Sequence, residues 1–422
     1  MSSANALWLN LFPAVISRIG ETRVASLRRT TEQSVALERL LSEECRRIEE
    51  HEGQYRTEAR IEIPNCVRDQ LLAFRPTPLL RAERWEHLLG FQGQIWIKRE
   101  DLTPSGSHKY NTALAQAHYA REQDLKGIVT DTGAGQWGVA LAMACAASDL
   151  RNVVFMPGHS YDRKEYRRLL MQAAGAEVYC SPSSVTAAGR IVCSHPDEEG
   201  RLSQAMSEAF EYAATHDEFC LGQGCMSFYA PLHQSIIGLE TEADLAALCI
   251  EPDLLVACAG GGTNLSGFMA PWLEDALLGR SIRRSPRLIA VESSEVPALT
   301  KGTYGYDSPD ACGVGDELLM FSLGSEQPMP DLDAAGLRYH AKSPLLSLFV
   351  HLGIVKATSA SQQEAKVAGT EFFRAEGILP APESAYALAA VRRLAFEARD
   401  DHSVVVVCLS GSGVLDAPFY SG

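Results

Sequence analysis

The chain has 422 residues, of which 46% are apolar and 22% charged, and its formal net charge is −15. This length exceeds one compact domain and suits two, and the composition is ordinary for a soluble globular enzyme. The negative charge and the lack of any basic tract exclude a nucleic-acid partner, because phosphate binding needs clustered Lys and Arg.

The cysteine pattern also argues against a metal site. Eleven of them stand at irregular spacings, with no CxxC pair and no Cys/His cluster, so no metal site is expected. Such an unpatterned set of thiols is typical of a reducing cytoplasm. No segment is long enough to span a bilayer.

The first 56 residues are expected to form a helical N-terminal extension. The apolar run at 6–16 lacks a basic region, so it is interpreted as an interfacial or partner-packing segment rather than a signal peptide. Residues 27–50 are rich in Arg and Glu, with apolar side chains at Val35, Leu37, Leu40 and Leu41, and this pattern predicts a surface helix.

From residue 57 onward, apolar strands alternate with helices. The expected elements are a strand at 94–100, a helix at 110–121, a strand, glycine loop and helix at 126–147, strands at 152–158 and 176–182, a helix at 203–216, a strand at 219–224, and further strand segments at 253–269, 287–294 and 404–413. Buried strands separated by helices predict an α/β fold with two parallel sheets and flanking helices. The expected domains are 57–230 and 231–422, with the packing of part of 75–107 on the other domain left open.

Lys109 stands in an unusual place. It follows a Gly-Ser-His step and precedes the predicted helix at 110–121. Unpaired N–H groups at a helix N-terminus favour anions over a permanent ammonium, so the position suits an amine held as a Schiff base. Lysines of this kind bind pyridoxal phosphate (PLP). Taken alone, Lys109 could equally be a solvated surface lysine.

Three strand-to-helix loops add to that pattern. Gly260-Gly261-Gly262-Thr263-Asn264 follows a buried strand and predicts a phosphate site. Thr132-Gly133-Ala134-Gly135-Gln136 repeats the logic for a carboxylate. Ser410, in LSGSG, would offer a neutral hydroxyl to the pyridine nitrogen of PLP. Such a partner leaves that nitrogen largely unprotonated and favours elimination and replacement at Cβ.

With these residues the chain resembles the β chain of tryptophan synthase, a fold type II PLP enzyme, over roughly residues 57–417. The matching segments are RPTPL (75–79), KREDLTPSGSHKYNTALAQA (98–117), DTGAGQWG (131–138), HQSIIGLE (233–240), AGGGTN (259–264), EGILPAPESAYALA (376–389) and LSGSG (409–413). Details such as GQWG, GLRYH (336–340) and PAPES resemble the free-standing second class of these β chains.

The resemblance implies a role for each matching position. Lys109 would form the Schiff base with PLP and move protons at Cα. The phosphate would be held by His108, Gly260, Gly261, Gly262, Thr263 and Asn264. The substrate carboxylate would be held by Thr132, Gly133, Ala134, Gly135 and Gln136. Ser410 would face the ring nitrogen, and Glu383 would lie close to the ring.

Two positions depart from the family pattern. Asp131 replaces the glutamate taken to act as acid and base beside incoming indole, and its side chain is shorter by one methylene, about 1.5 Å. Either the swap is tolerated or the nucleophile reaches further than indole does. Arg338 stands where α-paired chains carry an aspartate, and its guanidinium would suit the phosphate of O-phosphoserine or a structural ion pair. Tyr386, where relatives often carry histidine, and Trp137 would shape the pocket or simply pack.

The resulting hypothesis is a cytoplasmic PLP-dependent lyase or synthase of amino-acid biosynthesis. It would perform β-replacement on L-serine or O-phospho-L-serine through an aminoacrylate, with Lys109 and Asp131 as catalytic residues. With indole the product is tryptophan. The alternatives are a non-indole nucleophile, a serine-type eliminase or deaminase, and a non-catalytic PLP-binding protein. The resemblance implies a homodimer and leaves an α-subunit partner in doubt.

Overall fold

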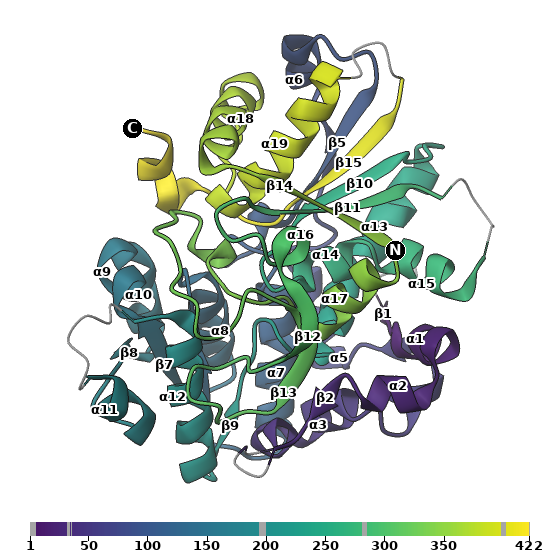
Figure 1. Cartoon of the computed structure of the whole chain (residues 1–422). Helices are drawn as coiled ribbons and strands as arrows, with labels where there is room; N and C mark the ends of the chain where they lie inside the picture. The colour runs from purple at the N-terminus through teal and green to yellow at the C-terminus, as the bar shows by residue number, and fades with distance from the viewer. Residues whose placement is uncertain are drawn as a thin grey trace.

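Two parallel sheets, seen in the computed structural model in Figure 1, organise the chain. The structure describes residues 6–31, 34, 36–193, 200–280, 285–397 and 402–421. The smaller sheet has the order β8-β7-β6-β9, and all its strands are parallel. Its strands are β6 (Gly127–Asp131), β7 (Arg151–Pro157), β8 (Glu177–Ser181) and β9 (Phe219–Leu221). The strand predictions for 126–131, 152–158, 176–182 and 219–224 are confirmed to within a few residues.

Helices surround this sheet, because β6 and β7 are buried over nearly their whole length and need cover on both faces. These helices are α7 (Tyr110–Glu122), α8 (Gln136–Ala147), α9 (Gly158–Arg163), α10 (Glu165–Ala173), α11 (Ala187–Cys193) and α12 (Leu202–Thr215). The predicted helices at 110–121 and 203–216 correspond to α7 and α12.

The larger sheet has the order β14-β11-β10-β15-β5-β4, and only β4 runs antiparallel. Its strands are β4 (Leu79–Arg81), β5 (Gln94–Arg99), β10 (Leu254–Cys258), β11 (Arg287–Ser293), β14 (Val355–Ala360) and β15 (Val404–Leu409). Strands β4 and β5 come from the first half of the chain but pair within the sheet of the second half. The larger sheet therefore contains strands from both halves of the chain.

The remaining elements cover the larger sheet or connect it to the smaller one. They are α5 (Asn65–Leu72), α6 (Glu83–Leu89), η3 (Glu100–Leu102), α13 (Tyr229–Ala247), α14 (Thr263–Phe268), α15 (Ala270–Leu278), α16 (Ala298–Lys301), β12 (Thr303–Asp307), β13 (Glu317–Ser322), η4 (Ala335–Leu337), α17 (Pro344–His351), α18 (Gln362–Glu376), α19 (Pro382–Glu397) and η5 (Val414–Tyr420).

The N-terminal extension is less helical than the sequence predicts. Its elements are β1 (Leu7–Leu9), α1 (Phe12–Ile19), α2 (Glu21–Ala25), β2 (Arg28–Arg29), η2 (Leu37–Leu40), α3 (Glu43–Glu49) and α4 (Gln54–Thr57), followed by β3 (Arg60–Glu62). The continuous surface helix predicted at 27–50 is wrong, and Val35 lies outside the described residues. Arg28 pairs with Glu38 and with the buried Glu49, while β2 joins β13, so tertiary contacts replace the helix.

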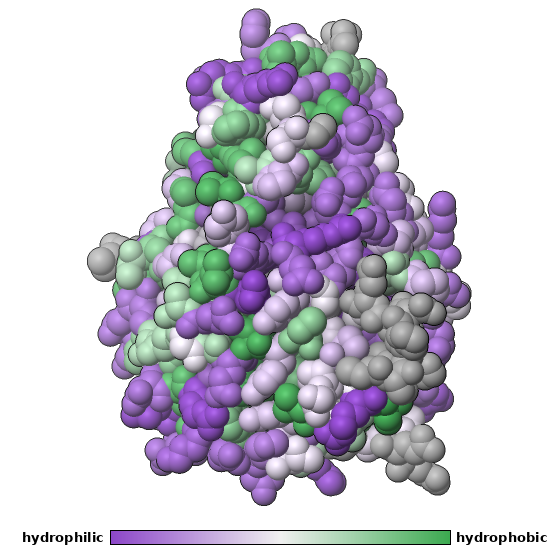
Figure 2. Space-filling model, turned by 90° about the vertical axis from the view of Figure 1, so that its left-hand side faces the viewer, coloured by the Kyte–Doolittle hydropathy of each residue, from purple (hydrophilic) through white to green (hydrophobic). Residues whose placement is uncertain are grey.

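The apolar N-terminal run packs within this chain. Strand β1 pairs with β3, Trp8 is buried, and the Leu9 N–H donates to Ser235 Oγ on α13 at 2.7 Å. No helix in the described ranges is both long and apolar enough to cross a membrane. On the face shown in Figure 2, hydrophobic residues form small patches separated by hydrophilic ones.

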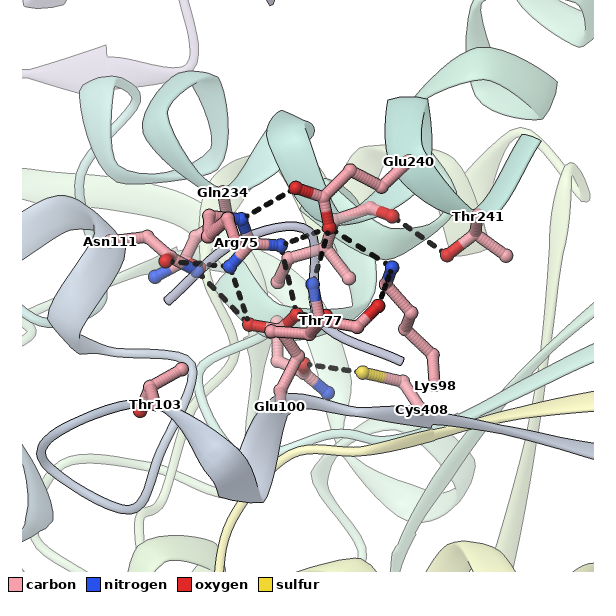
Figure 3. A network of polar contacts seen from close by, with 12 residues as sticks. Arg75, Thr77, Lys98, Glu100, Thr103, Asn111, Gln234, Glu240, Thr241 and Cys408 are labelled. Atoms are coloured by element: carbon pink, nitrogen blue, oxygen red, sulfur yellow. Dashed lines mark hydrogen bonds and ion pairs between the residues drawn. The ribbon is translucent and has the colours of Figure 1, made fainter. Parts of the chain in front are cut away.

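A buried ionic network joins the larger sheet to α7 and α13 (Figure 3). Arg75 Nη2 contacts Glu100 at 3.0 Å and Glu240 at 2.8 Å, and Lys98 Nζ contacts Glu240 at 3.0 Å. Burial opposes ionisation of Glu100, but Arg75 and Lys98 outweigh it and hold its pKa at about 2. Asn111 of α7 accepts from Arg75 at 2.9 Å, so the network fixes the helix that begins beside Lys109.

Candidate active site

One cavity lies where the strand ends of the two sheets face each other, as expected for open parallel sheets. Its empty volume is about 850 Å³. Residues from both halves of the chain line it, and they are His108, Lys109, Asp131, Thr132, Gly133, Ala134, Gln136, Trp137, Leu202, Met206, Gln223, Gly224, Cys225, Cys258, Gly260, Gly261, Gly262, Thr263, Asn264, Ala335, Gly336, Leu337, Glu383 and Ser410. The cavity therefore brings together nearly all the residues singled out in the sequence.

Lys109 is the N-cap residue of α7, where the sequence predicts it. The preceding loop is tied to the end of β15, since Ser107 bridges Gly411 and the His108 N–H donates to the Ser410 carbonyl at 3.0 Å. These two contacts bring Lys109 from the first half of the chain next to Ser410 from the last strand.

His108 is a buried, neutral imidazole. Burial lowers its pKa to about 3, and the nearby Lys109 charge acts in the same direction. Its Nδ1 atom is buried without a hydrogen-bond partner among the described residues. An orphaned polar atom in a cavity wall suits a bound polar group better than an apolar core.

The loop at 260–264 has the properties of an anion site. No backbone carbonyl among the described residues accepts from its N–H groups. Gly262 has φ +104° and starts α14, and a Cβ there would lie 2.6 Å from Leu346 Cδ2. Asn264 Nδ2 is buried and has no hydrogen-bond partner in the described parts of the chain, while its Oδ1 accepts from Cys408. Open N–H groups plus a free amide donor fit a phosphate.

The loop at 132–136 repeats this arrangement at the end of β6. Within the described part of the chain, no backbone carbonyl accepts from the N–H groups of residues 133–137. Thr132 Oγ1 accepts from the Gly138 N–H at 3.0 Å and the Arg167 guanidinium donates to the Ala134 carbonyl at 2.9 Å, which fixes the loop. Gly135, with φ +86°, is the N-cap of α8 and shapes the loop without lining the cavity.

Asp131 is the last residue of β6, directly before this loop, and it lines the same cavity as Lys109. Burial raises its pKa from 3.8 to about 7, and the charge of Lys109 only partly offsets the effect. A carboxyl that titrates near neutrality can take up and release a proton under ordinary conditions. Trp137, Leu202 and Met206 provide an apolar wall in the same cavity.

Ser410 and Glu383 complete the cavity from the larger sheet and α19. Ser410 Oγ lies 2.8 Å from Ser384 Oγ and 3.4 Å from Cys258 Sγ, so neutral groups surround it. Glu383 joins the two halves, because it accepts from the Gly336 N–H at 2.8 Å and from Gln136 Nε2 at 3.2 Å.

Comparison with known proteins decides the family. A family model described as a pyridoxal-phosphate dependent enzyme matches residues 71–411. The chain is 46% identical over 368 residues to the tryptophan synthase beta chain of Pyrobaculum aerophilum, covering 87% of this chain and 88% of the relative. It is 40% identical over 420 residues to tryptophan synthase beta chain 2 of Pyrococcus abyssi, covering 98% and 92%. The chain belongs to the tryptophan synthase β chain family.

Solved structures show the same fold at low identity. Threonine deaminase isoform 2 from Solanum lycopersicum aligns with a TM-score of 0.60 and 16% identity, covering 85% of this chain and 93% of that one. Serine racemase from Dictyostelium discoideum gives 0.58 and 19%, covering 82% and 96%. This β-chain family member is therefore a PLP-dependent enzyme of fold type II. Its orphaned His108 and Asn264 atoms and its open glycine loop fit the cofactor phosphate.

Arg338, predicted to bind substrate, and Tyr386, for which pocket and packing roles were both open, do not line this cavity. The Arg338 side chain donates from Nε to the Pro330 carbonyl at 2.7 Å and from Nη2 to the Met329 carbonyl at 3.1 Å, and it does not line the cavity. The sequence could not show that these carbonyls would engage the guanidinium. Tyr386 is fully buried in the core of the larger sheet and does not line the cavity, so it packs.

The sequence did not point to several lining residues. Gln223, Cys225 and Cys258 line the cavity, and Gln223 Nε2 is buried without a partner among the described residues. Gln223 and Cys225 follow β9 in a loop with no recognisable motif. Cys258 is the last residue of β10, one residue before the glycine loop begins, so its position in the sequence could have indicated that it lines the cavity. The described residues contain no group of three His, Cys, Asp or Glu that could hold a metal ion.

Proposed function

We propose that this protein catalyses β-replacement on L-serine or O-phospho-L-serine, as a tryptophan synthase β chain does with indole to give L-tryptophan. The observation that carries the proposal is the placing of Lys109, both loops with open N–H groups, and Asp131 around one cavity. A cofactor phosphate and a substrate carboxylate each need such a loop. The reaction also needs one base near Cα of the amino acid and one near the nucleophile.

The cofactor would be held by residues from both halves. The N–H groups of residues 260–264, the Asn264 amide and His108 would bind its phosphate, and Ser410 would face its ring nitrogen. Bound PLP supplies an electron sink that acidifies Cα of the amino acid. A hydroxyl partner for the ring nitrogen moderates that sink and favours chemistry at Cβ. Glu383, which accepts from Gly336 and Gln136, would lie close to the cofactor ring.

Lys109 and the carboxylate loop would act on the amino acid. The N–H groups of residues 133–136 would orient its carboxylate, so that the Cα proton faces Lys109. Lys109 would remove that proton and return it when the product forms. Its place at the start of α7, fixed through His108 and Ser410, keeps the amine within the cavity.

Asp131 would serve the second substrate. A carboxyl with a pKa of about 7 can accept a proton from an N–H or other acidic group of the nucleophile as that nucleophile adds at Cβ. The apolar wall of Trp137, Leu202 and Met206 favours a flat, largely apolar nucleophile such as indole. Gln223 Nε2, which has no partner within the described ranges, would suit a nucleophile that also carries a hydrogen-bond acceptor.

Arg338 would bind the phosphate leaving group of O-phosphoserine. Its guanidinium would have to leave the Met329 and Pro330 carbonyls to meet a phosphate. If it does, Arg338→Ala lowers kcat/KM for O-phosphoserine by about 10- to 100-fold, as expected for a lost charge-assisted contact, and spares serine. Arg163→Ala, which breaks an exposed pair with Asp331, is the matched control. Equal turnover of both substrates, unchanged in Arg338→Ala, would refute a role of Arg338 in recognising a phosphate leaving group.

The reaction type is tested by incubating the holoenzyme with either serine form and a panel of indoles, thiols, amines and phenols. Mass spectrometry should detect a β-substituted amino acid with at least one nucleophile. If keto acid and ammonia form instead, and no nucleophile suppresses them, the protein is an eliminase or deaminase. If neither product forms and the cofactor spectrum does not change with either serine form, the protein binds PLP without turning over.

The proposal extends to assembly and location. The family likeness supports a homodimer that works in the cytoplasm without an α subunit. The domain limits would lie near 57–230 and 231–422, with β4 and β5 of the first range pairing in the sheet of the second. Light scattering of the purified protein should give twice 45.9 kDa. A monomeric mass would refute the dimer.

A further inference from the structure

Lys342 is a buried cation that the proposed reaction does not use. It precedes α17, its side chain is 0% exposed, and Nζ donates to the Ala259 carbonyl at 2.9 Å. Its counter-charge is Glu292 on β11, 3.7 Å away. Burial of an ammonium group costs free energy, so a buried lysine is expected to have a structural or functional role.

The partner of Lys342 lies at the base of the glycine loop. Ala259 is the residue directly after β10, and its N–H still pairs with Val291 of β11. One step along the chain, the Ser343 N–H donates to the Gly261 carbonyl at 2.9 Å. Two consecutive residues, 342 and 343, therefore hold two alternate carbonyls of the loop.

Holding these carbonyls fixes the direction of the neighbouring N–H groups. The peptide bonds after Ala259 and Gly261 are trans, and in a trans peptide the C=O and the following N–H point in opposite directions. The carbonyls of Ala259 and Gly261 point toward residues 342 and 343. The N–H groups of Gly260 and Gly262 must then point away from them, and both glycines line the cavity.

The charge of Lys342 acts in the same sense. Glu292 is held by the N–H groups of Leu299 and Thr300 at 2.9 and 2.8 Å, so the pair cannot simply move apart. Burial lowers the pKa of the Lys342 ammonium, and the neighbouring Glu292 carboxylate opposes that shift and favours the charged form. In its charged form, Lys342 behind the loop favours a dianion in front of it.

We propose that Lys342 is a positioning residue for the cofactor phosphate: it holds the Ala259 carbonyl from behind, together with Ser343 on Gly261, so that the loop presents its N–H groups to the anion. The inference rests on the proposed function, in which residues 260–264 bind the phosphate. Lys342 itself touches neither cofactor nor substrate.

The test compares Lys342→Met with Lys98→Met. Lys98 is the matched control, since it is also 0% exposed, donates to a backbone carbonyl (Thr77, 2.7 Å) and faces a glutamate, but lies in the network of Figure 3. The readouts are the dissociation constant of PLP from the refilled apoprotein, measured by titration, and the melting temperature of the apoprotein. Both variants should melt lower, but only Lys342→Met should bind PLP about 10- to 100-fold more weakly.

The outcomes separate this inference from the proposed function. Asn264→Ala weakens PLP binding if residues 260–264 hold the phosphate, whatever Lys342 does. If Asn264→Ala binds weakly but Lys342→Met does not differ from Lys98→Met, the role of Lys342 is refuted and the phosphate site stands. If neither Asn264→Ala nor Lys342→Met affects binding, the phosphate assignment itself fails. Should Lys342→Met not fold, Lys342→Gln replaces the ammonium with a shorter, uncharged amide and should weaken PLP binding at least threefold, and unchanged binding would refute the inference.

Discussion

Asp131→Asn isolates the charge of one buried carboxyl, because asparagine has nearly the same size and does not titrate. In the folded protein the pKa of Asp131 is about 7, whereas the ordinary value is 3.8. Between these two values the folded protein holds the proton and the unfolded chain has lost it. Unfolding therefore releases a proton, and the stability of the wild type falls as the pH rises through this window.

The size of the effect follows from the pKa. A rise from 3.8 to about 7 corresponds to about 4 kcal/mol at pH 8 but to only about 0.6 kcal/mol at pH 4, where the folded carboxyl is protonated and the unfolded one is still partly protonated. With an unfolding entropy of about 2.1 cal/mol/K per residue over 422 residues, the effect at pH 8 is a melting-temperature difference of about 5 °C. Asp131→Asn should melt about 5 °C above the wild type at pH 8 and nearly level with it at pH 4.

The assay is calorimetry of both proteins from pH 4 to pH 8, paired with turnover. As the proton acceptor for the nucleophile, Asp131 must be ionised, so wild-type turnover should fall below pH about 7, and Asp131→Asn should lose about 10²- to 10⁴-fold. Asp131→Glu keeps the charge and should keep both pH profiles. Parallel melting curves for wild type and Asp131→Asn at every pH would show that the carboxyl is not raised, and the acid–base role would lose its basis.

Two further substitutions test the scaffold of the site. Gly262→Ala should weaken PLP binding about tenfold or more, because alanine is strained at φ +104° and its Cβ would meet Leu346. The control Gly279→Ala, at φ +63° with open space around it, should leave PLP binding unchanged. Equal affinities of the two variants in a PLP titration would contradict the shape assigned to the loop. Arg75→Met should lower the free energy of unfolding by about 3–5 kcal/mol, because it leaves the buried Glu100 and Glu240 short of a partner, and a loss below about 1 kcal/mol in urea unfolding would contradict this.

The sequence predicted the chemistry of the cavity because that chemistry is local. A buried strand followed by a glycine loop and a helix predicts an anion site without knowledge of its neighbours, and the structure has that strand, loop and helix at 127–136 and 254–264. Lys109 and Ser410 were predictable for the same reason, since each stands at the end of an element.

The rest depends on partners far away in sequence. Residues 27–50 do not form one helix, because Arg28 pairs with Glu49 and β2 pairs with β13. Strand β5 takes its position in the larger sheet by pairing with β15, some 300 residues later in the sequence. Arg338 turns to two carbonyls in its own loop, and Lys342 turns inward to Ala259. No periodicity or motif encodes such contacts, because a side chain takes the acceptor that folding brings nearest.

The central claim is that Lys109, among the buried or half-buried lysines, carries the cofactor at the meeting point of the two loops. Borohydride reduction of the holoenzyme, followed by trypsin and mass spectrometry, tests it directly. Reduced PLP should appear on the peptide 100–121, in which the modified Lys109 is no longer cleaved. Recovery of the label on a peptide containing Lys98 or Lys342 would contradict the account.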